Sequence, residues 1–177
     1  MTLAQNEFNN SILKDFTLQT VHKLLNGRRL SCIRAIGIGS LCWSLYHYGN
    51  LSSARQLSII LAIKEAFPDA IVTYQELRLH TAVIRWLKEE GIDVLEPSDD
   101  FSIIPKECQV NDPNGVTLCI MPHLPIHLVD NLLLSYWEET VLDNLIIIAD
   151  KFDRSYKGME FYRNSQKPCT GIKGPIQ

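Results

Sequence analysis

Two glycines one residue apart, Gly37 and Gly39, stand between an apolar run and Ser40 in the sequence AIGIGS. Glycine tolerates the backbone angles of a tight turn, and its missing Cβ lets peptide N–H groups come close to a phosphate. A nucleotide or S-adenosylmethionine would suit such a turn. The dinucleotide fingerprint is incomplete, however, because Cys42 occupies the place of the third glycine. A phosphate-binding turn and a simple corner after a strand both remain open.

Other polar residues are expected at the same edge of a sheet as the glycines. Ligands of open parallel sheets bind beyond the carboxyl ends of the strands. The candidates that follow or end the predicted strands are Gly37, Gly39, Ser40, Gln75, Glu76, Met121, Pro122, His123 and Asp150. We predict that they line one ligand site, in which Gln75 or Glu76 would reach a ribose. Glu76 lies further along the chain than the roughly 20 residues usual for a dinucleotide site.

The histidines give the best candidate for catalysis. His123 and His127 are four residues apart, but Pro125 lies between them and no third ligand is evident, so we expect no metal. His123 alone could donate to a phosphate or act as an acid or base near neutral pH. A polar loop residue bonded to a neighbouring carbonyl is an equally good interpretation. No Ser-His-Asp or Cys-His set is recognisable.

Five short apolar runs and four helical patterns must position these residues. The runs predict strands over 31–40, 69–74, 92–97, 116–123 and 145–150. The helical patterns predict helices over 7–26, 52–67, 76–91 and 125–136. The first should end at Asn26 and Gly27, the second should be capped by Ser52 or Ser53, and the fourth should begin at Pro125. Alternating strands and helices predict a Rossmann-like three-layer α/β sandwich, with a mostly parallel sheet of about five strands and helices on both faces.

Length and composition favour one soluble domain. The 177 residues are 46% hydrophobic and 21% charged, which is typical of a globular protein. We expect a helical segment over 1–30, an α/β core over 31–152 and a tail over 153–177. Trp43, Trp86 and Trp137 are expected to pack in the core or between helices.

Charge and hydropathy argue against nucleic acid and membranes as partners, and the cysteines indicate the compartment. The net charge of −3 argues against nucleic acid, and no stretch predicts a secretory signal or a membrane span. The five cysteines are odd in number and lack Cys-x-x-Cys spacing, which favours free thiols in a cytoplasmic or nuclear protein.

An ordered set of motifs over about residues 33–152 resembles the Sensitivity-to-Red-light-Reduced, or SRR-like, domain family. The set is IGIGS, ARQLSIILAI, VTYQE, CIMPH, DNLLLSYW and LIIIADKF. The residues that match the family pattern are Gly37, Gly39, Ser40, Gln56, Leu57, Met121, Pro122, His123, Trp137 and Phe152. The chain departs from that pattern at Gln75 and Glu76 in place of Asp-Pro, at Tyr136 in place of Asn, and at residues 149–151 in place of Gly-Asn-Ser.

The resemblance implies a regulatory protein, associated with circadian rhythm and light signalling in plants and with haem synthesis in other eukaryotes. It supplies no catalytic residue. A regulatory domain that binds a small nucleotide-type ligand, an enzyme using S-adenosylmethionine or a dinucleotide, and a scaffold that binds protein partners all remain open. The identity of any cofactor is not predicted.

Overall fold

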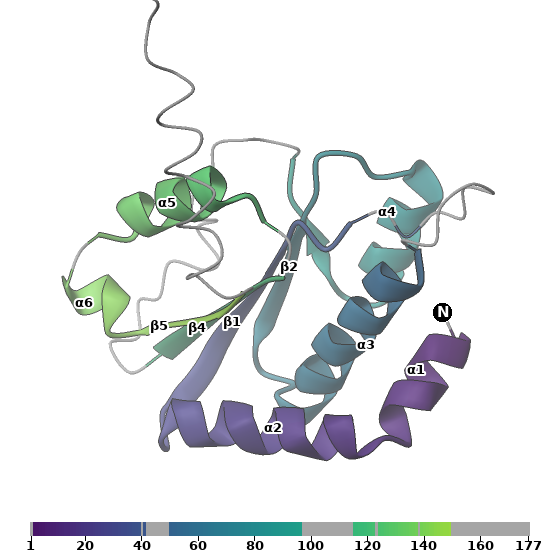
Figure 1. The fold of residues 1–177 in the computed structure, drawn as a ribbon, viewed down its shortest axis with the longest axis horizontal. Coiled ribbons are helices and arrows are strands. Elements are labelled where there is room, and N and C mark those ends of the chain that lie inside the picture. The colour runs from purple at the N-terminus through teal and green to yellow at the C-terminus, as the bar shows by residue number, and fades with distance from the viewer. Residues whose placement is uncertain are drawn as a thin grey trace, which may run out of the picture.

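A five-stranded parallel sheet forms the centre of the fold (Figure 1). The computed structural model describes residues 2–39, 41, 50–96, 115–122, 124–137 and 139–149. The strands are β1 (Arg29–Ile36), β2 (Ile71–Gln75), β3 (Asp93–Val94), β4 (Gly115–Met121) and β5 (Leu145–Ala149). They lie in the order β3-β2-β1-β4-β5, and every neighbouring pair is parallel. The predicted α/β fold with a parallel sheet is confirmed.

Six helices lie within the described residues. They are α1 (Thr2–Asn9), α2 (Ile12–Leu25), α3 (Asn50–Ala66), α4 (Thr81–Glu89), α5 (Ile126–Ser135) and α6 (Glu139–Leu142). The helix stop at Asn26 and Gly27 is confirmed, because both residues have positive φ angles, 49° and 81°. The predicted cap at Ser52 or Ser53 is wrong, since α3 already begins at Asn50.

Hydrophobic side chains cover both faces of the sheet. Alternate residues of β4 point to opposite faces, so Leu118 and Ile120 join a larger core while Cys119 and Met121 join a smaller one. Helices α2, α3 and α4 contribute to the larger core, through residues such as Val21, Leu57 and Leu87. Helices α5 and α6 close the smaller core (Figure 1). Helices therefore lie on both faces, as the sequence predicted.

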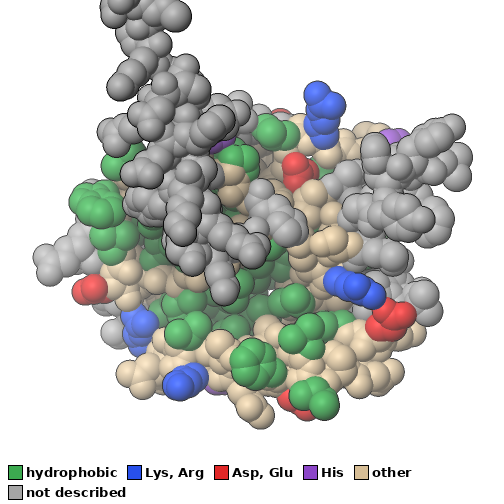
Figure 2. Space-filling model, in the orientation of Figure 1, with side chains coloured by type: hydrophobic (Ala, Val, Ile, Leu, Met, Phe, Trp, Pro, Cys, Tyr) green, Lys and Arg blue, Asp and Glu red, His purple; other side chains and the backbone are tan. Residues whose placement is uncertain are grey.

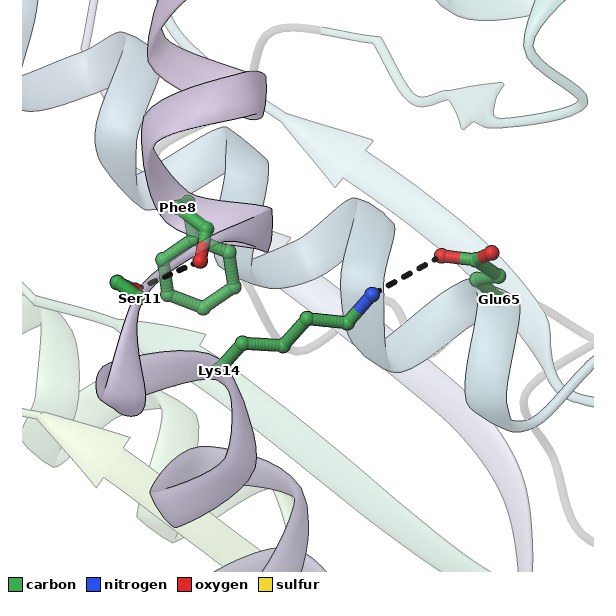
Figure 3. A network of polar contacts seen from close by, with 4 residues as sticks. All are labelled: Phe8, Ser11, Lys14 and Glu65. Carbon is green, nitrogen blue, oxygen red and sulfur yellow. Dashed lines mark hydrogen bonds and ion pairs between the residues drawn. The ribbon is translucent and has the colours of Figure 1, made fainter.

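Polar contacts join the two N-terminal helices to each other and to α3. Between α1 and α2, the Ser11 hydroxyl donates to the carbonyl oxygen of Phe8 at 2.6 Å (Figure 3). Lys14 on α2 forms an ion pair of 3.6 Å with Glu65 near the end of α3. The Phe8 side chain is itself buried. The N-terminal helices therefore pack on α3.

One side of α2 carries exposed hydrophobic side chains. They are Ile12, Leu13, Phe16 and Leu24, and Ile12 is 89% exposed. Figure 2 shows hydrophobic side chains along the lower part of the molecule, where Figure 1 places α2. Helix α2 thus buries one stripe, including Val21 and Leu25, and presents hydrophobic groups to solvent elsewhere.

Two expectations about single residues are wrong. Trp137 is 67% exposed and lies outside the core, whereas Trp86 packs against the larger core as expected. Cys32 is disulfide-bonded, which contradicts the expectation of free thiols, while Cys119 is a free buried cysteine. Trp43 and the predicted tail over 153–177 lie outside the described residues.

Candidate functional site

The ends of β1, β2 and β4 meet at one edge of the sheet. In the order β3-β2-β1-β4-β5, the chain progresses outward from β1 on one side and from β4 on the other, so the topological switch point lies between these two strands. Gly37 and Gly39 follow β1, Gln75 and Glu76 end and follow β2, and Met121 and Pro122 end and follow β4. We call these six residues the carboxyl edge.

The carboxyl edge contains six of the nine predicted site residues. Pairing places Ile36 opposite Gln75 and Ala35 opposite Ile120, so the three strands end at nearly the same level. Ser40, His123 and Asp150 lie outside the described residues. The structure thus brings the described candidates together, and their binding of a ligand stays a prediction.

Both glycines of the corner have backbone conformations that favour glycine. Their φ angles are 64° for Gly37 and 92° for Gly39. A Cβ on Gly37 would lie 3.0 Å from Leu124 Cδ1, and a Cβ on Gly39 would lie 2.7 Å from Ser53 Oγ. The corner is therefore packed between α3 and the segment that follows β4, and only glycine fits at Gly39 without a shift of its neighbour.

Glu76 closes this corner with a hydrogen bond across two strand ends. The backbone N–H of Gly39 donates to Glu76 Oε2 at 2.7 Å, and the N–H of Leu77 donates to Glu76 Oε1 at 3.0 Å. The N–H of Gly37 donates to the carbonyl oxygen of Gln75 at 3.0 Å. The Glu76 carboxylate thus already accepts the Gly39 N–H that would donate to a bound phosphate. A phosphate at this turn would have to displace Glu76.

Tyr74 supports the same corner from the larger core. Its hydroxyl donates to the carbonyl oxygen of Gly39 at 3.4 Å. Burial, and secondly the negative charge of Glu76, raise the pKa of Tyr74 well above its ordinary value. The hydroxyl therefore stays protonated at neutral pH and remains a donor.

A buried arginine on β1, which the sequence interpretation did not single out, lies close to the carboxyl edge. Arg34 has no exposed surface. Its Nη1 donates to the Tyr136 hydroxyl at 2.5 Å and its Nη2 donates to Gln75 Oε1 at 3.3 Å, while its Nε is buried with no hydrogen-bond partner. The signal in the sequence was a lone charge inside the otherwise apolar run SCIRAIG.

The groups around Arg34 are neutral at physiological pH. The Arg34 carbon Cζ lies 5.9 Å from the centre of the Tyr136 ring, and Cys119 is the residue paired with Arg34 on β4. Burial raises the pKa of Cys119 to about 11, although Arg34 acts in the opposite direction. Burial also raises the pKa of Tyr136, and Arg34 again opposes the rise. Neither side chain therefore supplies a negative charge near pH 7.

The described residues contain neither a cluster of side chains suited to a metal ion nor a helix suited to span a bilayer. His127 is exposed, and no group of three or more His, Cys, Asp or Glu side chains suited to a metal ion occurs among the described residues. In the same part of the chain, every helix is too short or too polar to span a bilayer.

Comparison with known proteins identifies the family. The searches against curated proteins and against solved structures each gave no significant match. The model of the SRR1 domain matches residues 13–171, which is most of the chain and includes every described residue of the carboxyl edge. The chain therefore belongs to the SRR1 domain family.

Proposed function

We propose that this chain is an SRR-like regulatory protein that binds a nucleotide-type ligand at the carboxyl edge, with Glu76 as the acceptor for the ribose hydroxyls. One observation supports this assignment above the others. Two backbone N–H groups fix the Glu76 carboxylate beside the switch point of the sheet. A carboxylate offers about four acceptor positions, so the two bonds to the backbone leave room for two hydroxyl groups.

The same geometry changes the role proposed for the glycines. Because Glu76 already accepts the Gly39 N–H, we assign Gly37 and Gly39 to the shape of the corner and to close approach by the ligand, and not to phosphate binding. The enzyme alternative depends on His123 as acid or base. That residue lies outside the described part of the chain, so its role stays a prediction.

The first experiment asks whether a nucleotide-type ligand binds. Native mass spectrometry of the purified chain detects a retained cofactor, and a thermal-shift panel of ATP, NAD and S-adenosylmethionine detects one that dissociates. A ligand at about 100 times its dissociation constant adds about 2.7 kcal/mol to stability, which gives a measurable rise in melting temperature.

Paired variants then test the role of Glu76. We expect Glu76→Gln to weaken the response to the active ligand, because the amide loses one acceptor oxygen and the negative charge. Glu89→Gln removes the same charge from an exposed position on α4 and is the matched control. An equal response of both variants and the wild type would contradict the proposal.

A second candidate is a protein-binding scaffold without a ligand. It is favoured by the exposed hydrophobic side chains of α2. No retained molecule and no response to the whole panel would favour this candidate over ligand binding.

The cellular process is proposed from the family alone. We propose a role in light and circadian signalling if the source is a plant, and in regulation of haem synthesis if it is another eukaryote. Deletion of the gene should then change rhythmic output or haem content, and the wild-type chain should restore it. Unchanged rhythm and haem content would count against this part of the proposal.

A further inference from the structure

Arg34 carries a positive charge in the interior, and the described residues place no negative group beside it. The side chain is fully buried, and its guanidinium donates hydrogen bonds to two uncharged groups, the Tyr136 hydroxyl and the Gln75 amide oxygen. Among the described residues, no carboxylate lies within ion-pair distance of its guanidinium. Buried charges in proteins are normally paired, and the part of the chain that the structure describes supplies no such pair for Arg34.

The neutral neighbours cannot serve as that partner. Cys119 and Tyr136 both keep their protons near pH 7, because burial raises the pKa of each side chain more than Arg34 lowers it. Gln75 offers only an amide. The negative charge must therefore come from outside this set of side chains.

One edge of the buried guanidinium has donor capacity left for a negative group. The Nε–H and an N–H of Nη2 lie side by side on the edge remote from Cδ, and such a pair matches two oxygens of a carboxylate or phosphate. In Arg34 the Nε–H has no partner, and Nη2 makes a long hydrogen bond of 3.3 Å to Gln75. The better bond, from Nη1 to Tyr136, lies outside this pair.

The Nη2 end of this edge lies at the carboxyl end of the sheet, because it contacts Gln75. Gln75 is the last residue of β2 and pairs with Ile36, the last residue of β1. The Arg34 guanidinium thus extends toward the strand ends, where ligands enter open α/β sheets. It contacts Tyr136 beyond the end of α5 and so lies on the face that α5 covers.

We propose that Arg34, with Gln75 and Tyr136, forms a binding site for an oxyanion that presents two oxygen atoms to the Nε and Nη2 edge, either a carboxylate or a phosphate group of a small molecule. The site is separate from the contact between Glu76 and Gly39, and its test does not require the nucleotide-type ligand. Inorganic phosphate and acetate are the two probes.

The test measures thermal melting of the full chain in phosphate and in acetate, with chloride added to keep the ionic strength constant. We expect the melting temperature of the wild type to rise and saturate with at least one probe. Arg34→Met, which has a long side chain without donors, should lose this rise. Arg85→Met removes the same charge from an exposed position on α4 and should keep it. A rise in melting temperature with acetate alone, with phosphate alone or with both then shows which oxyanion the site accepts.

Two further measurements cover the case in which Arg34→Met does not fold. Arg34→Lys keeps the charge but loses the paired donors, and should bind the active probe about tenfold or more weakly. Calorimetric titration of the wild type should show one saturable site. No binding of either probe to the wild type, or equal responses in the wild type, the Arg34 variants and Arg85→Met, would overturn the proposal.

Discussion

The carboxylate of Glu76 accepts a hydrogen bond from the backbone N–H of Gly39 at 2.7 Å, across the ends of two neighbouring strands. This bond joins the corner after β1 to the first residue beyond β2. It converts two features that are separate in the sequence into one local structure. It also places a negative charge where a phosphate-binding turn would offer a free donor.

Loss of this bond should reduce stability. Glu76→Ala leaves the Gly39 N–H without its acceptor, and for a half-buried charged hydrogen bond we expect a cost of about 1 to 2 kcal/mol in the free energy of unfolding. Glu76→Gln keeps an acceptor oxygen and should cost about half as much or less. Urea unfolding of both variants measures the difference. Wild-type stability in Glu76→Ala would mean that the bond contributes nothing in solution.

Gly39 should tolerate substitution less well than Gly27. Both have positive φ, 92° and 81°, but a Cβ on Gly39 would lie 2.7 Å from Ser53 Oγ, whereas a Cβ on Gly27 would meet no atom within 4 Å. We expect about 1 to 2 kcal/mol for Gly27→Ala from the backbone angle alone, and about 1 to 3 kcal/mol more for Gly39→Ala from the added contact.

A double variant separates the two causes at Gly39. In Gly39→Ala with Ser53→Ala the close oxygen is absent, so the double variant should be destabilised by less than the sum of the single variants. Additive costs would show that Ser53 is not the obstacle. Because Gly39 variants change stability, a test of ligand binding with Gly39→Ala needs a parallel measurement of its folding.

The fold could be predicted because each strand can be recognised from its local sequence pattern. Apolar runs such as the one ending at Met121, separated by amphipathic helices, leave few arrangements besides a parallel α/β sheet. Boundaries were less predictable. Asn50 begins α3 ahead of the serines that looked like caps, and α6 has only four residues, too few to leave a periodic pattern.

The position of the carboxyl edge followed from topology, but its contacts did not. The register between Ile36 and Gln75 decides that Glu76 reaches Gly39, and no local pattern encodes that register. Arg34 was overlooked for a different reason. A strand covered on both faces should lack charge in its interior, so the arginine in the middle of this one was itself the signal, whereas Arg29 stands at its exposed first position.

The hydroxyl of Tyr136 should matter more than that of Tyr74. Tyr136 accepts a bond from the buried Arg34 guanidinium, whereas Tyr74 donates over 3.4 Å to an uncharged carbonyl. Tyr136→Phe deprives a buried charge of an acceptor and should cost about 1.5 to 3 kcal/mol, against about 1 kcal/mol or less for Tyr74→Phe. Unfolding in denaturant measures the free energy of unfolding of Tyr136→Phe and Tyr74→Phe, which remove the same hydroxyl group. Equal costs would mean that Arg34 finds another acceptor when Tyr136 loses its hydroxyl.

Cys119 should make the folded chain sensitive to alkaline pH. Burial raises the pKa of its thiol from the ordinary 9.0 to about 11, with Arg34 partly opposing the rise, so the folded state favours the protonated form. A raised pKa in the folded state contributes stability that is complete below pH 9 and is lost as the pH rises through about 11. The free energy of unfolding should therefore fall in this window, by at most about 1.4 kcal/mol per pH unit for this one group.

Tyr74 and Tyr136 also have raised pKa values and act in the same direction, so the comparison must isolate Cys119. Cys119→Ala removes the thiol and leaves both tyrosines. Its unfolding free energy, measured in urea at pH 8, 9.5 and 10.5, should fall less steeply than that of the wild type, whatever its absolute stability. Parallel pH profiles would mean that the Cys119 thiol ionises in the folded chain as easily as in the unfolded chain.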